Sequence, residues 1–410
     1  MSDNSKPHAV IVGAGLAGLA CASDLAAAGA TVTVLEAGDA VGGRMRTDRR
    51  AGFLLDRGFQ VFNTSYPQVQ RRLDLRALQL CAFTPGMLLH TGQGRARFAD
   101  PTRRPAQAAD ILLSQFVGPR DLAALGVLSA RDMLLPARLI KHGRERTTIA
   151  ALASAGISRE LIEQFFRPFL AGVFLEDELE TSSRFFHLVW RSMLRGTLCL
   201  PRRGIQAVPD QLAAALPPGT IQTEAPVSGL TDDGVLLADG NELRAGAVVV
   251  AAGPAAAAQL LPGLDIPATR IVTTLYHAAA VPPLAEPTLL VDTERTILHT
   301  SVLTEVTRGY SGDGRALISS SVLGEGGADL EPTVRGRLAA LYETETAGWE
   351  HLATYTVEGA LPAMVPPQSL SRPCRVGPRR YVCGDHRATG SVQGALASGA
   401  RAAREILADA

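Results

Sequence analysis

Residues His8 to Arg46 read HAVIVGAGLAGLACASDLAAAGATVTVLEAGDAVGGRMR. The run predicts a short β-branched strand, a tight glycine turn, an Ala/Leu-rich helix that stops at Gly29, and a second strand that closes with Glu36. The glycines of the first turn have the spacing G-x-G-x-x-G. Such a strand–turn–helix–strand unit is typical of dinucleotide binding, because the helix N-terminus offers free N–H groups and a positive dipole end to phosphates.

Each glycine of this motif, and the acid that closes the unit, has its own physical role. Gly13 permits the sharp turn, Gly15 lets the backbone approach a pyrophosphate, and Gly18 lets the helix pack against the strand. Glu36 can accept hydrogen bonds from ribose hydroxyls. We therefore expect dinucleotide contacts from Gly13, Ala14, Gly15, Leu16, Ala17, Gly18, Glu36 and Ala37. The alternative is an ordinary βαβ unit that carries an acid by accident.

A second glycine turn follows the acid and distinguishes between dinucleotides. The string EAGDAVGGRMRT resembles the Glu…Gly-Gly-Arg signature of the flavoprotein superfamily that contains amine oxidases, protoporphyrinogen oxidases and phytoene desaturases. That resemblance implies FAD, with the glycines against its pyrophosphate and the arginine neutralising it. The implied contacts are Gly42, Gly43, Arg44, Met45 and Arg46. Ala40 stands where the family often has an arginine, and Arg46 is expected to compensate.

The stretch RYVCGDHRATGSVQGALASGARAAREIL, from Arg380 to Leu407, resembles the C-terminal signature of the same superfamily. It predicts a strand, a Gly-Asp turn, a second turn and a helix from Val392. The resemblance implies that the carboxylate holds a ribityl hydroxyl and that the helix N-terminus faces the pyrimidine end of the flavin, where it stabilises negative charge. The implied contacts are Gly384, Asp385, Ser391, Val392 and Gln393. An ordinary turn aspartate is the alternative for Asp385.

Three further segments are expected at the flavin by resemblance. Gly52–Phe62 predicts two strands with a turn at Arg57-Gly58, and it implies contacts from Gly58, Phe59 and Gln60. Val227 occupies the place of a backbone contact to adenine. Ala247–Gly253 is a fully apolar run, which favours a buried parallel strand whose carboxyl end, at Ala252 and Gly253, faces the cofactor.

The two signatures lie at opposite ends of the chain, so we predict an α/β fold with a discontinuous Rossmann-type FAD-binding domain. The second domain is expected to be an α+β substrate domain, with an antiparallel sheet and a helical cap. The predicted segments are 1–85, 200–260 and 369–410 for the FAD-binding domain, 86–199 for the helical part and 261–368 for the sheet part. An aromatic cluster at residues 165–190 is expected to be either core or pocket wall.

Composition excludes several other classes. The 410 residues are 46% hydrophobic and 20% charged with a formal net charge of +0, which argues against a broad nucleic-acid surface. Five scattered cysteines fit reduced thiols and no metal site. No apolar run is long enough to span a membrane and the start MSDNSKP has no secretory features, so we expect a cytoplasmic protein. Apolar positions 133–140 with cations after them leave a peripheral membrane contact open.

The sequence singles out no catalytic side chain. His386 follows the Gly-Asp turn, where a surface position is expected, and Cys383 lacks the motif of a flavin thioether, so noncovalent FAD is predicted. Ser391 replaces an aromatic cage residue of amine oxidases, and Lys6 and Lys141 are the only lysines. These departures favour hydride transfer from a small apolar or aromatic substrate, of the desaturase or dehydrogenase type, with oxygen, a quinone or another acceptor reoxidising the flavin. A peroxide-producing amine oxidase and a non-redox isomerase or mutase are the alternatives; the oligomeric state stays open.

Overall fold

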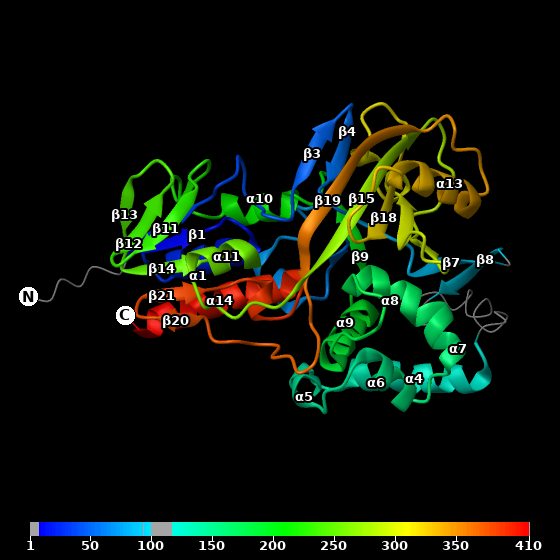
Figure 1. Ribbon diagram of the computed structural model, residues 1–410, viewed down its shortest axis with the longest axis horizontal. Helices are drawn as coiled ribbons and strands as arrows, with labels where there is room; N and C mark the ends of the chain where they lie inside the picture. Colours follow the sequence, from blue (N-terminus) through cyan, green and yellow to red (C-terminus); the bar gives the residue numbers. More distant parts are fainter. Residues whose placement is uncertain (1–7, 93, 100–116, 410) are drawn as a thin grey trace, which may run out of the picture.

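The computed structural model describes residues 8–92, 94–99 and 117–409. The expectations for the polar start and for the helical pieces at 100–116, with Ile111, Leu112, Leu113 and Phe116, lie outside the described residues. Two bodies of structure are visible in Figure 1, one built on each of two large sheets. No helix in the described ranges has both the length and the apolar character needed to cross a membrane.

The first body is a six-stranded sheet in the order β10-β2-β1-β14-β21-β20. Its strands are β10 (Ile221–Gln222), β2 (Val32–Leu35), β1 (Ala9–Val12), β14 (Ala247–Val250), β21 (Arg380–Val382) and β20 (Arg375–Gly377). β2, β1, β14 and β21 run parallel, and only the edge strand β20 is antiparallel. The sheet therefore combines segments from the beginning, middle and end of the chain, and the predicted Rossmann-type architecture is confirmed.

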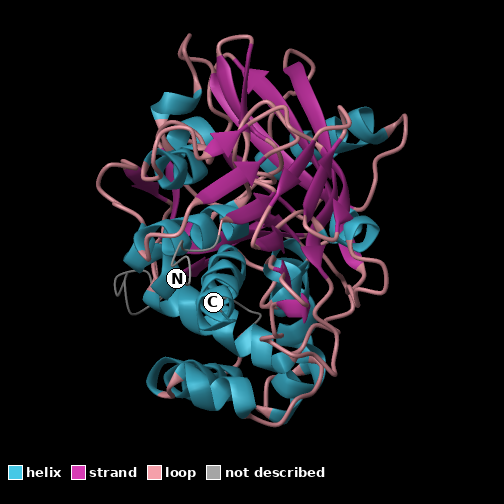
Figure 2. Cartoon of the chain, turned by 90° about the vertical axis from the view of Figure 1, so that its left-hand side faces the viewer, coloured by secondary structure: helices cyan, strands magenta, loops and turns pink. Residues whose placement is uncertain are grey.

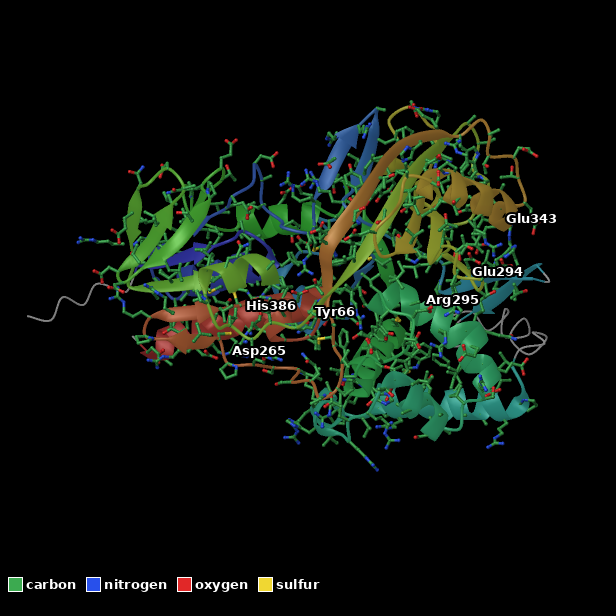
Figure 3. The ribbon with its side chains drawn as sticks, in the orientation of Figure 1. Tyr66, Asp265, Glu294, Arg295, Glu343 and His386 are labelled. Carbon is green, nitrogen blue, oxygen red and sulfur yellow. The ribbon has the colours of Figure 1, made fainter. Side chains whose placement is uncertain are left out.

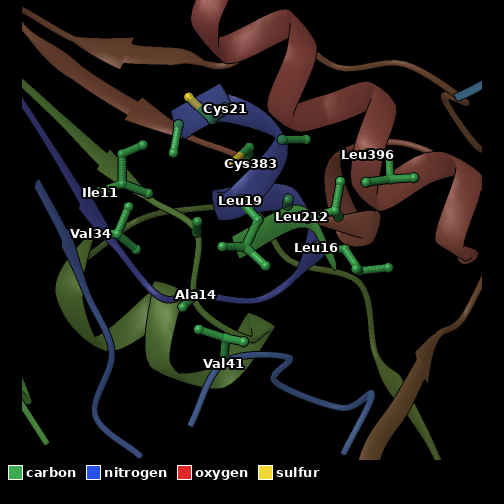
Figure 4. Packing of buried hydrophobic residues seen from close by; sticks show 14 of the residues in the cluster. Ile11, Ala14, Leu16, Leu19, Cys21, Val34, Val41, Leu212, Cys383 and Leu396 are labelled. Carbon is green, nitrogen blue, oxygen red and sulfur yellow. The ribbon is translucent and has the colours of Figure 1, made fainter. Parts of the chain in front are cut away.

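Helices α1 (Leu16–Ala27), α10 (Ala207–Ala214) and α14 (Val392–Asp409) cover one face of this sheet. The core between them is apolar and dense, as Figure 4 shows with Ile11, Leu19, Val34 and Leu396. Gly399 allows α14 to cross α1 closely, because a Cβ there would lie 2.1 Å from the Ala17 carbonyl oxygen. A three-stranded sheet of β11 (Val227–Thr231), β12 (Gly234–Leu237) and β13 (Glu242–Arg244) and helix α11 (Pro254–Leu260) complete this body.

The second body is a seven-stranded sheet in the order β19-β15-β18-β17-β16-β7-β8. These strands are β19 (Glu350–Pro362), β15 (Thr269–Ala279), β18 (Ala316–Leu323), β17 (His299–Val302), β16 (Leu290–Asp292), β7 (Gly86–Thr91) and β8 (Gly94–Ala99). Helix α13 (Leu330–Tyr342) packs on one face through Val334, Leu338 and Leu341. The predicted antiparallel sheet is thus present, with one parallel pair between β16 and β7.

Helices form a separate layer below this sheet in Figures 1 and 2. They are α4 (Pro119–Leu134), α5 (Ala137–His142), α6 (Thr148–Ser154), α7 (Arg159–Leu161), a π-helical turn (Ile162–Phe166), α8 (Arg167–Phe174) and α9 (Ser183–Arg195). Phe165, Phe166, Phe186 and Trp190 are all buried in one cluster. The aromatic region is therefore part of a buried core, and Phe165 also lines a small cavity beside β7 and β8.

The remaining elements connect the two bodies. They are the hairpin β3 (Thr47–Arg50) and β4 (Phe53–Asp56), the small sheet of β5 (Phe62–Asn63), β9 (Leu198–Pro201) and β6 (Leu80–Ala82), and helices α2 (Pro67–Arg72) and α12 (Leu303–Val306). The division of the chain into five domain segments stays a prediction.

Gly52–Phe62 contains a strand, β4, a bend at Arg57-Gly58, where Gly58 has a φ of +85°, and then the start of β5, as predicted. A further turn at Ala51-Gly52, where both residues have positive φ, joins β3 to β4. The amphipathic pattern of residues 66–80 predicts one helix, but α2 ends at Arg72, because Leu73 adopts an extended conformation. The sequence likewise predicts a helix over Arg335–Trp349, but α13 covers Leu330–Tyr342 and stops at Glu343, which has left-handed backbone geometry.

Candidate active site

The parallel strands bring four separate turns to one edge of the six-stranded sheet. The register aligns Val12 with Leu35 on one side and with Val250 on the other. Val250 in turn aligns with Val382. The turns that follow these strands contain Gly13, Glu36, Ala252 and Gly384, so the two terminal motifs meet at the same carboxyl edge. In open α/β sheets this edge is where ligands bind.

The first glycine turn has the shape of a phosphate cradle. Gly13 has a φ of +106°, and a Cβ on Gly18 would lie only 2.0 Å from the Gly13 carbonyl oxygen. Gly15 is different, because a Cβ there would meet nothing within 4 Å. Helix α1 begins at the next residue. Its N-terminus has no side-chain cap among the described residues, and the space beside the Gly15 Cα is open.

The second glycine turn closes on the first. The Gly42 N–H donates to the Ala14 carbonyl oxygen at 2.9 Å, and a Cβ on Gly43 would lie 3.5 Å from the Gly15 Cα. Gly42 also has a φ of +119°, a conformation that favours glycine. Met45 and Arg46 are buried behind this turn, where Arg46 pairs with Asp39 at 2.9 Å. The backbones of the two glycine motifs are thus in direct contact.

Glu36 sits at the end of β2 with both carboxylate oxygens engaged. Oε2 accepts from the Ala14 N–H at 2.7 Å and Oε1 accepts from the Gly38 N–H at 2.9 Å. Ala37 beside it is exposed. Since an ionised carboxylate has about four acceptor positions, Glu36 keeps capacity for hydroxyl donors.

Arg44 connects the glycine turns to three other parts of the chain. Its Nη2 lies 2.7 Å from Asp385 Oδ1, and its Nη1 donates to the Ala360 carbonyl oxygen at 2.6 Å. Its backbone carbonyl accepts from Gln60 Nε2 at 2.7 Å. The Arg44 side chain is still 36% exposed, so one face of the guanidinium remains open to a ligand.

The Gly384-Asp385 turn contains buried polar atoms without hydrogen-bond partners. Asp385 Oδ1, despite its ion-pair contact with Arg44, has no aligned hydrogen-bond donor among the described residues, and neither ring nitrogen of His386 has a partner there. Both residues are buried, and burial lowers the pKa of His386 to about 4. Unsatisfied buried polar atoms are costly, so their clustering beside an open glycine cradle is what a polar cofactor requires. The residues present therefore fit FAD.

His386 was expected at the surface, and this expectation was wrong. The residue, which is labelled in Figure 3, is only 1% exposed. Its ring packs against Gly384, where a Cβ would lie 2.4 Å from His386 Cε1. Nothing in the linear sequence distinguishes this turn histidine from an exposed one.

The N-terminus of α14 lies beside the same turn. Ser391 Oγ accepts from the Gly394 N–H at 3.1 Å and so caps the helix. Gln393 Oε1 accepts from the Gln68 N–H at 2.9 Å, which ties α14 to α2. Val392 and Gln393 are both half-buried. A helix end held in this way presents its positive dipole end to the site.

The remaining expected contacts surround this centre. Gly58 is buried with a φ of +85°, and the Phe59 N–H donates to Thr274 Oγ1 at 3.3 Å. Val227 packs against the cluster that contains Leu35, at the Glu36 end of the sheet. Ala252 is half-buried and Gly253 is exposed just after β14.

Asp56, close to Gly58 in sequence, has a structural environment. Its carboxylate accepts from Thr47 Oγ1 at 2.6 Å, Tyr310 Oη at 2.7 Å and the Ile205 N–H at 3.0 Å. Burial raises the pKa of Asp56 in spite of these donors. Sequence reasoning missed this network, since its donors come from segments far apart in the chain.

Cys383 lies in the core and not in the site. It is fully buried, and burial raises its pKa well above the ordinary value, with the nearby Cys21 and Cys374 contributing. Figure 4 shows Cys383 and Cys21 together beneath α14. Among the described residues, no group of three or more His, Cys, Asp or Glu side chains is arranged to hold a metal ion.

The family model described as flavin containing amine oxidoreductase matches residues 16–407. A coproporphyrinogen III oxidase from Propionibacterium freudenreichii is 27% identical over 350 residues, which cover 70% of this chain and 64% of that relative. A phytoene dehydrogenase from Streptomyces griseus is 36% identical over 123 residues, covering 28% of this chain and 23% of that one. The chain therefore spans less than two thirds of the length of these relatives.

The fold also has counterparts among solved structures. A candidate protoporphyrinogen oxidase from Exiguobacterium sp. 255-15 superimposes with a TM-score of 0.75 at 17% identity. The match covers 99% of this chain and 100% of that one. At this identity the likeness concerns the fold.

Proposed function

Since the chain belongs to the family of flavin-containing amine oxidoreductases, we propose that it is a FAD-dependent oxidoreductase that removes a hydride from an apolar small molecule. The observation that carries this proposal is the convergence of both terminal motifs on one sheet edge, joined by Arg44 and Asp385 at 2.7 Å. The domain segments given above are part of the same proposal, with the cofactor in the discontinuous domain and the substrate under the seven-stranded sheet.

Most of the residues named from the sequence are proposed to bind the cofactor. The backbone of Gly13–Gly18 and of Gly42–Gly43 would receive the diphosphate, and Glu36 the adenosine ribose. Arg44 would neutralise phosphate charge, and Asp385 would accept from a ribityl hydroxyl. Arg44 already pairs with Asp385, so both side chains are held at the proposed site before the ligand binds. FAD, when bound, supplies the hydride-accepting ring.

The chain's own contribution to the chemistry is then electrostatic and positional. The N–H groups of Val392 and Gln393 at the start of α14 favour negative charge at the pyrimidine edge. Gly58 allows the backbone to approach closely, and Phe59 provides an apolar surface. No side chain is assigned as a base. The buried, protonated thiol of Cys383 supports noncovalent attachment of the cofactor.

The substrate class is proposed from the composition of the second body. The Ala360-Leu361 segment that accepts from Arg44 also packs with Ala171, Leu175 and Leu298, an apolar cluster. These apolar surroundings favour an apolar substrate that undergoes desaturation or dehydrogenation over a charged one. Oxygen, a quinone or another acceptor would reoxidise the flavin, since no second G-x-G-x-x-G indicates a bound nicotinamide cofactor.

Amine oxidation is the second candidate, because the family includes that activity in its description. Against it, Ser391 serves as a helix cap where the amine-oxidase branch is expected to have an aromatic residue. Lys141 is exposed on α5 and so is not positioned as a buried site lysine. A non-redox isomerase is the third candidate.

Anaerobic mixing of the FAD-loaded protein with tetrapyrrole, isoprenoid and amine compounds tests these three. Bleaching of the flavin band by a tetrapyrrole or isoprenoid supports the first. Bleaching by primary or secondary amines alone, followed by peroxide on admission of air, would support amine oxidation. Turnover of an isoprenoid without net flavin reduction would support the isomerase.

A further inference from the structure

A row of side chains crosses the face of the seven-stranded sheet that is turned away from α13. The register places Thr274, Ser321 and His299 side by side on β15, β18 and β17. Val291 and Leu89 continue the row on β16 and β7. Side chains at paired positions lie on one face of a sheet, so the row changes from polar to apolar at His299.

His299 differs from the polar residues beside it. Thr274 Oγ1 accepts from the Phe59 N–H at 3.3 Å and bonds Ser321 Oγ at 3.1 Å, so both hydroxyls are engaged. His299 is only 7% exposed, and its Nε2 has no partner among the described residues. Burial alone lowers its pKa to about 4, so the ring is neutral at pH 7. A buried unpaired ring nitrogen is costly unless a ligand completes it.

The structure also makes room for this ring. Helix α8 passes over it at Gly172, where a Cβ would lie 2.8 Å from His299 Nδ1. On another side the ring contacts Phe59, with centroids 4.8 Å apart. The imidazole is therefore fixed between α8 and Phe59, with Nε2 as its unsatisfied atom.

A series of packing contacts and chain neighbours connects His299 to the candidate cofactor site. Gly172 and His299 directly follow Ala171 and Leu298, and these two residues pack with Ala360 and Leu361. The Ala360 carbonyl accepts from Arg44, which pairs with Asp385. Phe59 directly follows Gly58. His299 is thus connected through these contacts to the residues around the candidate cofactor site, and this inference rests on the function proposed above.

We infer that His299 is a substrate-contacting residue whose Nε2 hydrogen-bonds a neutral polar group of an otherwise apolar substrate. A neutral imidazole offers one donor or one acceptor and no charge, so it suits a pyrrole N–H, a hydroxyl or a carbonyl. The same imidazole does not increase the binding affinity for a pure hydrocarbon. His299 therefore discriminates among substrates of the desaturase type by this one contact.

The test measures binding to the FAD-loaded protein, in matched detergent micelles, with phytol as an uncharged apolar probe that carries one hydroxyl and phytane as the matched hydrocarbon probe. H299L should weaken phytol binding up to about tenfold and leave phytane binding unchanged. H299Q, which keeps a polar nitrogen near the Nε2 position, should restore most of the loss. His90, adjacent to Leu89 and so on the opposite face of the sheet, supplies the control H90L, which should alter neither affinity.

Flavin content and the midpoint of thermal unfolding are recorded for each variant, so that a folding defect is recognised. Unchanged phytol affinity in H299L, an equal loss for phytane, or a wild type that holds phytol no more tightly than phytane would each overturn the inference. A failure of the proposed function is distinguished by a different measurement. In that case no candidate compound would reduce the flavin, whereas the ratio of the two binding constants does not depend on flavin reduction.

Discussion

Arg44 Nη2 and Asp385 Oδ1 lie 2.7 Å apart, and they join the second glycine turn to the loop that precedes the last helix. Asp385 is buried whereas Arg44 is partly open, so this ion pair lies at the boundary between the core and the surface. Such a pair is costly to break from one side, because the partner is left charged and unpaired. It gives a direct way to test whether the two ends of the chain act on one ligand.

R44A should lower the affinity for FAD by about 10- to 100-fold, since it removes a charge-assisted contact and leaves Asp385 without its partner. The measurement is a fluorescence titration of apoprotein with FAD. R49A, at an exposed cation on β3, is the matched control and should bind as the wild type does. Equal affinities for R44A and wild type would contradict the assigned role.

Two glycine substitutions should separate cofactor binding from folding. G15A introduces a Cβ that meets no protein atom within 4 Å, so the apoprotein should fold with its stability nearly unchanged and yet exclude the diphosphate. G18A places a Cβ 2.0 Å from the Gly13 carbonyl oxygen and should impair folding itself. Circular dichroism and flavin absorbance of the two purified variants distinguish these outcomes. Full flavin retention in G15A would argue against the cradle.

Buried histidines should make the protein sensitive to mild acid. The pKa values of His277, His299 and His386 are each lowered to about 4, mainly by burial. The unfolded state then binds more protons between about pH 6.5 and pH 4, so stability falls as pH falls through this window. Each site contributes at most about 3 kcal/mol.

Urea unfolding between pH 4.5 and pH 8 measures this slope. H386Q should flatten it, and H142Q, at an exposed position on α5, should leave it unchanged. A slope that H386Q does not alter would mean that His386 is not a neutral buried group.

The Asp56 network should be a stability element. D56A leaves the Thr47 and Tyr310 hydroxyls and the Ile205 N–H without their acceptor, so we expect a loss of about 3 kcal/mol or more in the free energy of unfolding. Y310F removes one bond and should cost about 1 kcal/mol. D313N, at an exposed turn, serves as the control in the same denaturant titrations. An effect of D56A below that of Y310F would contradict this assignment.

The flavin should be released on denaturation. Acid precipitation of the holoprotein should leave all the yellow colour in the supernatant, and C383A should retain FAD as the wild type does, because Cys383 faces Cys21 in the core. Flavin that stays with the pellet in the wild type but not in C383A would reveal a thioether.

The parts of the structure that local pattern controls were predictable. Helix α1 was expected to begin at Leu16 and α14 at Val392, and both do. Glycine spacing and helical periodicity are encoded in neighbouring residues, which explains this agreement. The assignment of individual side chains to FAD stays a prediction.

Features that depend on distant segments were not predictable. The contact between Arg44 and the Ala360 carbonyl requires β19 to bend, which it does beside Gly359, a residue with a φ of +68°. The early end of α2 and the burial of His386 likewise depend on what packs over them. A one-dimensional pattern carries no signal for such packing.

The order of strands in the six-stranded sheet has a consequence for biogenesis. β1 lies between β2 and β14, and the other edge of β14 pairs with β21, which begins only at Arg380. During translation the early strands therefore leave the ribosome with one edge uncovered, over a span of more than a hundred residues. Completion of this sheet, and with it of the edge where both terminal motifs meet, therefore has to await synthesis of the last thirty or so residues.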